Sequence, residues 1–412
     1  MLSSLLSPTR VLSFEELSPA DFAKAAFYLG GAPRKAAVVV DGRAFPERDA
    51  LVAGLSALCE TVVLDRVRPD PLASDVDAMR EMIGGGELGL VVGIGGGSVL
   101  DSAKALAMLA ANGGSLSDYL GPAPSRKIEK KGPPLLLVPT TAGTGSEATK
   151  VGVFTSDSGR KYTLGSPLLQ ADAAILSGSL AAGMPPALAA STGFDALSHA
   201  LESLWNRNAT PVTVQAAVDA AVAVLRGLEP AYDAAVAAAA GKPLPGAKAA
   251  ALRMLEAASM AGFAFSRTGT AMVHALSFVL SEEWHVPHGA ACAFTLEDAY
   301  RYALSEPENR ARLARIGAAL FPEAAAARSA AMGGASESAQ DRDERLAGLL
   351  LERVLVLKRK MGLPERFADL GISVDRGAIP GLFARSFDDP KMANNFPAAE
   401  RPAVYAILEA KA

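Results

Sequence analysis

Two side chains that could bind a metal ion, Asp195 and His199, lie four residues apart in STGFDALSHALESLW (Ser191 to Trp205). Apolar residues recur through this segment with helical spacing, which predicts a helix. Residues four apart lie on the same face of a helix, so the carboxylate and the imidazole point the same way. Glu202 lies on nearly the same stripe. On its own, this spacing favours an ordinary surface pair over a metal site.

The other histidines favour the metal interpretation. The chain has only four histidines, and His274, His285 and His288 all fall within GTAMVHALSFVLSEEWHVPHGAACAF. We therefore predict a site for one divalent ion, with these ligands: Asp195, His199, His274 and His288. Imidazole and carboxylate suit Fe²⁺ or Zn²⁺, and a fifth position must stay open for a substrate oxygen. The alternative is a set of structural histidines, each satisfied in a core or at the surface.

A glycine-rich turn in LGLVVGIGGGSVLDSAKALAML predicts an anion-binding loop. The strand pattern ends at Gly95, Gly96 and Gly97, where the backbone can approach a ligand closely. Ser98 then begins a helix whose free N–H groups favour an anion. Ser98 takes the place of the last glycine in the GxGxxG fingerprint. Its spacing from Asp101 is also that of a capping box, so a capped helix after a tight turn is the alternative.

A second candidate loop, PTTAGTGSEAT (Pro139 to Thr149), follows the apolar run PLLLVP. Its glycines and hydroxyls suit backbone contacts to phosphates or a nicotinamide, and the candidate residues are Thr140, Thr141, Thr144 and Ser146. Asp41 closes another strand-like run, AAVVVD. An acid at a strand end can bind a ribose 2′-hydroxyl and repel a 2′-phosphate, which favours NAD over NADP. In the common dinucleotide fold this acid follows the glycine loop, whereas here it precedes it.

The elements that must position these residues divide into two kinds. Up to residue 185, helix-like segments separate short apolar runs, which predicts a parallel sheet covered on both faces. The predicted strands are Ala36 to Val40, Thr61 to Asp65, Leu88 to Ile94 and Pro134 to Pro139. After Pro185, long Ala/Leu-rich runs predict an all-helical domain. We therefore predict an α/β domain over residues 1–185 and a helical domain over residues 186–412.

Composition excludes several classes of function. The 412 residues are half apolar, and the net charge of −4 with interspersed signs gives no reason to expect binding to nucleic acid. Two cysteines, Cys59 and Cys292, predict neither a disulfide framework nor a cysteine-ligated metal site. We find no apolar run of membrane-spanning length and no signal peptide, and so expect a soluble, cytoplasmic protein. The Ala/Ser/Gly-rich stretch from Pro322 to Asp343 is expected to form a loop.

Taken in order, four segments resemble the iron-containing (group III) alcohol dehydrogenase family. They are GGGSVLDSAK, PTTAGTGSEAT, GFDALSHALES and the pair formed by His274 with PHG at His288. The resemblance spans roughly residues 36 to 294, and DDPKMANNFP near the end is similar to the tail of that family. It implies a dehydroquinate synthase-like fold, with a parallel-sheet dinucleotide-binding domain and an all-helical metal-binding domain.

The resemblance also implies roles for individual residues. The metal would be held by Asp195, His199, His274 and His288. The dinucleotide would be held by the glycine loop (Gly95, Gly96, Gly97 and Ser98), by Asp101, and by Thr140, Thr141, Thr144 and Ser146. Lys161, in GRKYTLGSP, matches a lysine near the cofactor and substrate, which makes it both a cofactor-binding and a catalytic candidate.

The chain departs from the family at the residues expected to transfer a proton. Many members carry a histidine four residues after the ligand matching His274, where this chain has Phe278. His285 lies nearby in sequence and is the remaining candidate for proton transfer. With an aromatic residue at this position, the chain is similar to a branch of the family that includes phosphonoacetaldehyde reductases and enzymes oxidising sugar-acid alcohols. Arg267 or Lys150 could meet an anionic substrate.

The sequence therefore predicts a metal-dependent, NAD(P)-linked alcohol dehydrogenase or aldehyde reductase acting on a small primary alcohol or aldehyde. The substrate could be anionic, such as a phosphonoaldehyde or a sugar-acid alcohol, and the resemblance implies at least a homodimer. Three alternatives remain. They are a polyol or glycerol-phosphate dehydrogenase-like zinc enzyme of the same fold, a metal-independent reductase such as maleylacetate reductase, and a non-catalytic binding protein that retains the fold.

Overall fold

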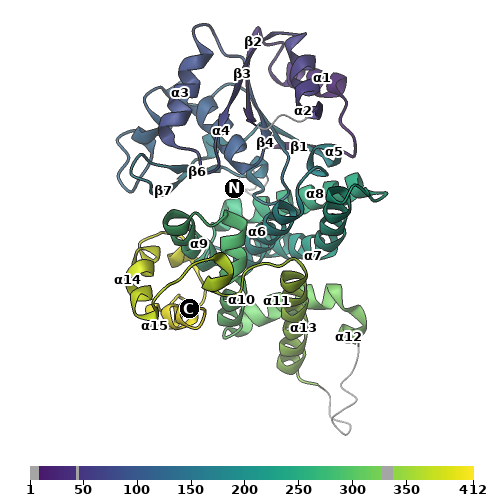
Figure 1. Ribbon diagram of the computed structural model, residues 1–412, viewed down its shortest axis with the longest axis vertical. Coiled ribbons are helices and arrows are strands. Elements are labelled where there is room, and N and C mark those ends of the chain that lie inside the picture. The colour runs from purple at the N-terminus through teal and green to yellow at the C-terminus, as the bar shows by residue number, and fades with distance from the viewer. Residues whose placement is uncertain (1–8, 43–45, 327–336) are drawn as a thin grey trace. The chain divides into compact units, whose positions relative to one another are not determined.

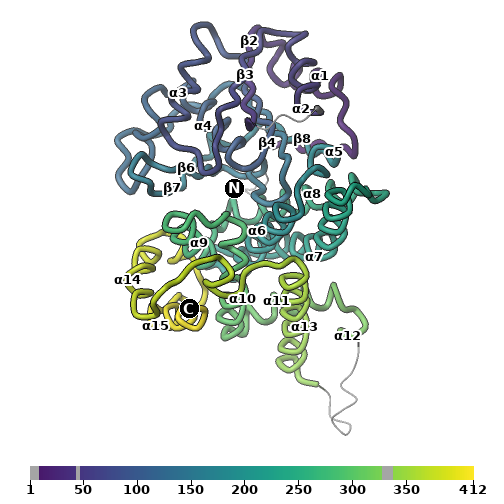
Figure 2. The backbone as a smooth tube through the Cα atoms, viewed as in Figure 1, coloured from purple at the N-terminus to yellow at the C-terminus, as the bar shows by residue number. Residues whose placement is uncertain are grey.

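The computed structural model describes residues 9–42, 46–326 and 337–412, and Figure 2 follows the backbone through them. The chain forms two compact units. The first comprises Met1–Pro185 and Ala234–Gly262, and the second comprises Pro186–Asp233 and Phe263–Ala412. The segment Ala234–Gly262, which the sequence assigns to the helical domain, therefore groups with the sheet.

A six-stranded parallel sheet forms the centre of the first unit (Figure 1). In spatial order its strands are β1 (Arg10–Phe14), β8 (Ala173–Ser177), β5 (Leu135–Pro139), β4 (Leu90–Gly95), β2 (Lys35–Asp41) and β3 (Glu60–Val67). The four predicted strands are confirmed as β2, β3, β4 and β5. Sequence reasoning missed β1 and β8, and it missed the antiparallel hairpin of β6 (Val151–Thr155) and β7 (Lys161–Gly165).

Helices cover both faces of this sheet, as the unbroken apolar strands require. In β2, Val38 and Val40 belong to one apolar cluster, whereas Ala37 and Val39 belong to the other. The first cluster includes residues of α1 (Pro19–Leu29), α2 (Pro46–Ser56) and α5 (Gly178–Ala181). The second includes residues of α3 (Ala73–Ile83) and α4 (Gly97–Asn112). Figure 1 shows α1 and α2 on the opposite side of the strands from α3.

The sheet brings the predicted cofactor residues together at the carboxyl ends of its strands. Gly95 at the end of β4 pairs in register with Pro139 at the end of β5, and β2 ends beside β4 at Asp41. Because the carboxyl ends of parallel strands meet at one edge, the glycine loop, the threonine-rich loop and Asp41 share that edge. Ligands of open α/β sheets bind there.

The second unit is helical. Its elements are α6 (Pro186–Leu204), most of α7 (Pro211–Ala239), the end of α8 (Ala247–Thr268), α9 (Met272–Trp284), α10 (His288–Ala303), α11 (Pro307–Leu320), α12 (Pro322–Ala326), α13 (Ala339–Lys360), α14 (Ile379–Phe383) and α15 (Arg401–Glu409). Within it, α10 packs against both α6 and α9. All residues from Gly193 to Leu204 are buried, so α6 is a central helix with no solvated face.

Two expectations about individual segments need qualification. The predicted loop from Pro322 to Asp343 is helical at its ends, in α12 and α13, and residues 327–336 lie outside the described residues. Among the described helices, α7 alone is long and apolar enough to cross a membrane by length and composition, and 56% of its apolar window is buried.

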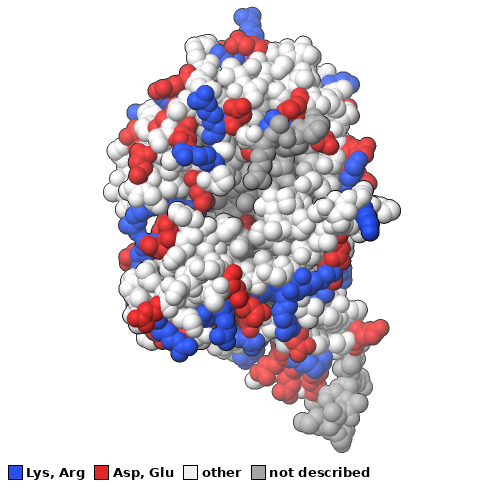
Figure 3. Space-filling model, viewed as in Figure 1, with Lys and Arg blue, Asp and Glu red and all other residues white. Residues whose placement is uncertain are grey.

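On the face drawn in Figure 3, acidic and basic side chains are interspersed, in keeping with the small net charge.

Candidate metal centre and glycine loops

Asp195 and His199 lie inside the helical unit rather than at its surface. Asp195 is 2% exposed and His199 is 5% exposed, both on the central helix α6. A buried carboxylate is costly unless it is paired or binds a metal. The surface-pair interpretation of this spacing is therefore wrong.

Three histidines meet at one oxygen of Asp195. His274 comes from α9, and His288 is the first residue of α10. The distances to Asp195 Oδ1 are 3.4 Å from His274 Nε2, 3.5 Å from His288 Nε2 and 3.7 Å from His199 Nδ1. Ligand atoms held about 2.1 Å from a single tetrahedral ion lie roughly 3.4 Å apart. Each of the three histidine nitrogens therefore lies at a distance from the carboxylate oxygen that fits a shared divalent ion.

The carboxylate oxygen at the centre and the facing nitrogen of His274 have no hydrogen bond to satisfy them. Asp195 Oδ1 and His274 Nε2 are buried and form no hydrogen bond within the described part of the chain. Buried polar atoms in native proteins are normally partnered, so an orphaned acceptor facing an orphaned ring nitrogen indicates a missing ligand. The donor set of carboxylate and imidazole fits Fe²⁺ or Zn²⁺.

Glu202 fixes the orientation of His274. Its carboxylate is fully buried, and Oε2 lies 2.6 Å from His274 Nδ1. The same carboxylate accepts hydrogen bonds from the backbone N–H groups of Ala271 (2.9 Å) and Val273 (2.5 Å), at the start of α9. When Nδ1 donates its proton to Glu202, Nε2 is the ring nitrogen that faces Asp195 and is placed to bind a metal ion.

Cys292 is a donor that sequence reasoning did not assign to the site. It is fully buried one helical turn after His288, and its Sγ lies 3.8 Å from His288 Nε2. Donor atoms of Asp195, His274, His288 and Cys292 all lie within 4.8 Å of one another. The HxxxC spacing in PHGAACAF was the signal, because residues i and i+4 share a helix face.

Opposite charges shift the pKa values of these buried groups. Burial acts to raise the pKa of Asp195, but the charges of His199 and His288 outweigh it and hold the pKa well below its usual range. Burial acts to lower the pKa of His274, but Cys292 and Glu202 raise it well above its ordinary value. For Cys292, burial acts to raise the pKa, and the charges of His274 and His288 lower it below its usual range.

The structure does not bring His285 into this cluster. It is exposed and forms the left-handed C-cap of α9 at φ 54°, and no described hydrogen bond or ring contact joins its side chain to the four donors. Phe278, at the position where the family resemblance led us to expect a relay histidine, lies 6.3 Å from His288 between ring centroids. Lys391 Nζ covers that ring at 3.8 Å and pairs with Asp389 at 3.0 Å. Arg267 instead stacks on Phe263 at 3.8 Å.

In the sheet unit the two candidate cofactor loops pack against each other. A Cβ atom at Gly97 would lie 2.7 Å from Thr144 Cγ2, and one at Gly96 would lie 3.4 Å from Thr141. The backbone N–H of Thr140 also donates to Gly95 O at 3.0 Å. Helix α4 begins at Gly97 with Gly96 as its N-cap and no side-chain cap. The capping-box alternative for Ser98 and Asp101 is therefore wrong.

Asp101 and Ser146 are engaged with each other. Ser146 Oγ donates to Asp101 Oδ1 at 2.6 Å, and Asp101 Oδ2 accepts from the backbone N–H of Val153 at 2.8 Å. Lys104 Nζ donates to Ser146 Oγ at 2.7 Å and to Thr149 Oγ1 at 3.0 Å. Burial lowers the pKa of Lys104 to about 8, although Asp101 and Glu147 act to raise it. This network fixes the threonine-rich loop on α4.

The remaining candidates lie near the same edge. Lys161 Nζ pairs with Asp70 Oδ1 at 2.7 Å, and its side chain is only 5% exposed. The backbone N–H of Asp70 donates to Ser98 Oγ at 3.3 Å, so Asp70 links Lys161 to the start of α4. Asp41 is half-buried at the end of β2, where its carbonyl accepts from Arg48 at 2.7 Å.

Comparisons with known proteins agree with both halves of this description. Residues 17–177 match the family model of iron-containing alcohol dehydrogenase, and residues 189–412 match the C-terminal model of the Fe-containing alcohol dehydrogenase family. The chain is 40% identical over 211 residues to long-chain-alcohol dehydrogenase 1 of Geobacillus thermodenitrificans, which covers 51% of each chain. It therefore aligns with about half the length of that relative.

Two sulfoacetaldehyde reductases are also similar. The enzyme of Bilophila wadsworthia is 32% identical, over 78% of this chain and 76% of that protein. The crystal structure of the enzyme from Bifidobacterium kashiwanohense, in complex with NAD⁺, superposes with a TM-score of 0.77 at 26% identity. That superposition covers 98% of this chain and 97% of the other.

Proposed function

Because the chain belongs to the iron-containing alcohol dehydrogenase family, we propose that it catalyses the metal-dependent, NAD-linked interconversion of a small primary alcohol and its aldehyde. The observation that carries this proposal is the meeting of His199, His274 and His288 at one oxygen of Asp195. Three alternatives from the sequence fit this less well. An intact ligand set has no use in a metal-independent reductase or a binding protein, and the third histidine departs from the usual zinc polyol dehydrogenase pattern.

The chemistry divides between two bound groups and the residues that hold them. A divalent ion supplies Lewis acidity toward a substrate oxygen, and a nicotinamide dinucleotide supplies or takes up the hydride. Asp195, His199, His274 and His288 would hold the ion, and the hydrogen bond from Nδ1 to Glu202 would orient His274 so that Nε2 binds it. Both Fe²⁺ and Zn²⁺ suit these donors.

The glycine and threonine loops would hold the dinucleotide. Gly95 to Ser98 lead into α4, whose N-terminal N–H groups favour a phosphate, and Thr140, Thr141 and Thr144 pack beside them. Asp101 and Ser146 keep the second loop in place through their mutual hydrogen bond. Asp41 at the end of β2 favours NAD over NADP, because a carboxylate repels a 2′-phosphate.

An anionic aldehyde is the substrate class that we favour. Lys391 Nζ lies 3.8 Å from the ring of Phe278, and that ring lies 6.3 Å from the ring of His288, so an ammonium lies near the proposed metal centre. Two similar proteins are sulfoacetaldehyde reductases, whose substrate carries a sulfonate two carbons from the carbonyl oxygen. We also propose that the enzyme works in the cytoplasm as at least a homodimer, and that Lys161 acts near the cofactor.

The test is NADH and NADPH consumption with neutral and anionic aldehydes, measured on chelated protein and again after addition of Fe²⁺ or Zn²⁺. We expect activity with one metal, a preference for NADH, and a loss of at least about 1,000-fold in kcat in His274→Ala. NADH binding, followed by fluorescence, should persist in that variant because the cofactor loops lie in the other unit. Turnover that is indifferent to chelation and metal would overturn the proposal.

A further inference from the structure

We propose that Cys292 Sγ binds the same divalent ion directly, so that the centre is a mixed carboxylate, imidazole and thiolate site. This inference rests on the metal site of the proposed function and adds a ligand to it. The thiol loses its proton to solvent as the bond from sulfur to the metal forms, and no oxidation or reduction is involved.

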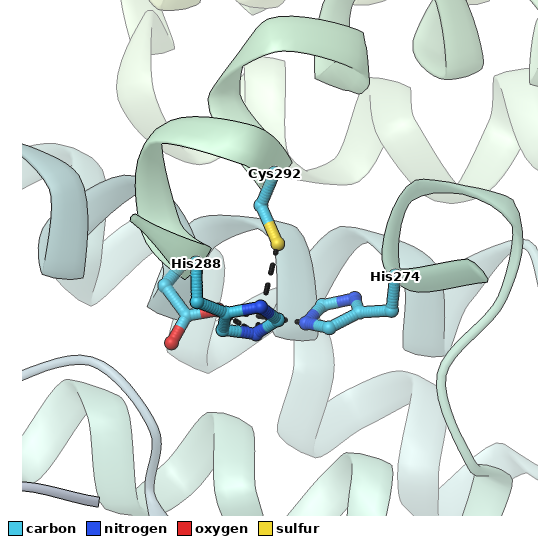
Figure 4. A group of neighbouring side chains, drawn as sticks. His274, His288 and Cys292 are labelled. Atoms are coloured by element: carbon cyan, nitrogen blue, oxygen red, sulfur yellow. Dashed lines mark hydrogen bonds and ion pairs between the residues drawn. The ribbon is translucent and has the colours of Figure 1, made fainter. Parts of the chain in front are cut away.

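The position of Cys292 on α10 aims its thiol at the other donors. It follows His288 by one helical turn, so the two side chains share a face of the helix. Sγ lies 3.8 Å from His288 Nε2 (Figure 4). With a metal–sulfur bond of about 2.3 Å and a metal–nitrogen bond of about 2.1 Å, tetrahedral ligands would lie roughly 3.6 Å apart. The observed spacing therefore fits two ligands of one ion.

A second observation points to a ligand at the same place. Asp195 Oδ1 and His274 Nε2 belong to side chains that are 3% and 4% exposed, and neither atom has a hydrogen bond within the described residues. Both lie within 4.8 Å of the thiol. A cysteine buried only for packing would be surrounded by apolar groups, whereas this thiol faces a carboxylate and two imidazoles.

The chemical consequence concerns the choice of metal. Thiolate is a softer ligand than carboxylate or imidazole and suits Zn²⁺, whereas an all-nitrogen and oxygen site discriminates less. Donor atoms of Asp195, His274, His288 and Cys292 lie within 4.8 Å of one another, and His199 Nδ1 lies 3.7 Å from Asp195 Oδ1. We therefore expect Cys292 to increase the affinity for Zn²⁺, and its loss to reduce that affinity by at least about tenfold.

The test is the absorption spectrum of the Co²⁺-substituted protein, which reports the ligands without any assay of activity. A thiolate ligand gives an intense sulfur-to-cobalt charge-transfer band in the near ultraviolet, while the weaker visible bands report cobalt bound by any donors. The spectra are compared for the wild type, Cys292→Ser, Cys292→Ala and Cys59→Ser. Cys59 is the other cysteine and lies in the sheet unit, half-buried, near Leu55 O at 3.8 Å.

We expect the wild type and Cys59→Ser to show the near-ultraviolet band, and both Cys292 variants to keep the visible bands without it. Chelator competition should show the tenfold loss of Zn²⁺ affinity in Cys292→Ser. Visible bands without a near-ultraviolet band in the wild type would overturn the role of Cys292 and leave the metal centre standing. A wild type with neither set of bands would overturn the metal centre itself and this inference with it.

Discussion

At the scale of single residues, the site depends on one buried oxygen. Asp195 Oδ1 has three imidazole nitrogens within 3.7 Å, and the residue is only 2% exposed. In water each of these groups would be hydrated. Burying them in a core is therefore costly unless they share a partner. The helix geometry explains how they meet, since Asp195, His199 and Glu202 follow spacings of four and three residues.

The first prediction concerns Glu202, whose hydrogen bond with His274 is proposed to orient that ligand for the metal. Glu202→Gln keeps the size of the side chain but directs an amide N–H at His274 Nδ1, which would favour a proton on Nε2 instead. We expect metal affinity to fall about 10- to 100-fold, measured by chelator competition. Glu283→Gln, on the helix α9 that carries His274, is the control, because Glu283 is more exposed than Glu202 and pairs with Arg385. Equal affinities in the wild type and Glu202→Gln would contradict the positioning role.

The sequence predicted which histidines meet at Asp195 better than it predicted the surroundings of that residue. Asp195, His199, His274 and His288 stood out because histidine is rare in this chain and two of them share helical spacing with other donors. Cys292 was dismissed because two cysteines cannot form a cysteine-ligated site of their own, an argument that ignores mixed donor sets. His285 was grouped with the others by proximity in sequence, but the left-handed turn that ends α9 leaves it exposed.

At the scale of elements, packing against the threonine-rich loop explains why the glycine loop needs a glycine at its end. Gly97 is the first residue of α4, where alanine would be a better helix former. A Cβ there would lie 2.7 Å from Thr144 Cγ2, closer than real carbon atoms approach. The glycine therefore serves the packing of two loops at the edge of the sheet, rather than the helix that it begins.

The second prediction follows from this contact. Gly97→Ala should displace the threonine-rich loop and raise the KM for NADH by about tenfold, equivalent to about 1.4 kcal/mol of binding. Removing the opposing methyl group in Gly97→Ala/Thr144→Ser should recover part of that loss. Gly85→Ala is the control, because a Cβ there meets nothing within 4 Å. If the double variant bound NADH no better than Gly97→Ala, steric contact with Thr144 would not be the cause.

Periodicity predicted β2, β3, β4 and β5 and missed β1 and β8, which form the other end of the sheet. The runs that became β2, β4 and β5 are apolar throughout because they are buried on both faces. By contrast, β1 is mostly exposed at the edge of the sheet, so its sequence RVLSF carries no such pattern. The hairpin β6–β7 is stabilised by pairing between short strands and by contacts such as Val153 N–H to Asp101, which the sequence does not display.

At the scale of the whole molecule, stability and function make different demands on buried charge. In the helical unit, Lys358 on α13 is 1% exposed, and its Nζ has no hydrogen bond within the described residues. Burial, with the nearby charge of Lys411, lowers its pKa to about 8, while Glu297, Asp298 and Glu365 act to raise it. This ammonium lies outside the metal cluster, so its cost should appear in stability alone.

The third prediction concerns this lysine and pH. Between pH 8 and pH 10.5 the unfolded chain holds a proton that the folded chain has lost, so the penalty is complete below pH 8 and declines as pH rises. Lys358→Met should therefore stabilise the protein by about 3 kcal/mol at pH 7, and by much less near pH 10. Urea unfolding of both proteins at the two pH values measures this.

Lys360→Met provides the comparison on the same helix. Hydrogen bonds to Asp233 and Glu229 raise the pKa of Lys360, so its removal should cost stability rather than add to it. The effect should stay within about 1 kcal/mol because the ion pairs are solvated. A gain in Lys358→Met that is the same at pH 7 and pH 10 would assign it to packing instead of charge.

The origin of the metal ligands on separate helices has a consequence for the unfolded chain. Asp195 and His288 lie about 90 residues apart, so an ion that stays bound to both would close a long loop. Closing a loop of that length removes conformational entropy from the unfolded ensemble, worth about 4 kcal/mol for a covalent cross-link. The ion would thus act as a removable cross-link. Chelation would then abolish activity and would also slow refolding, because the unfolded chain would have more conformations to lose.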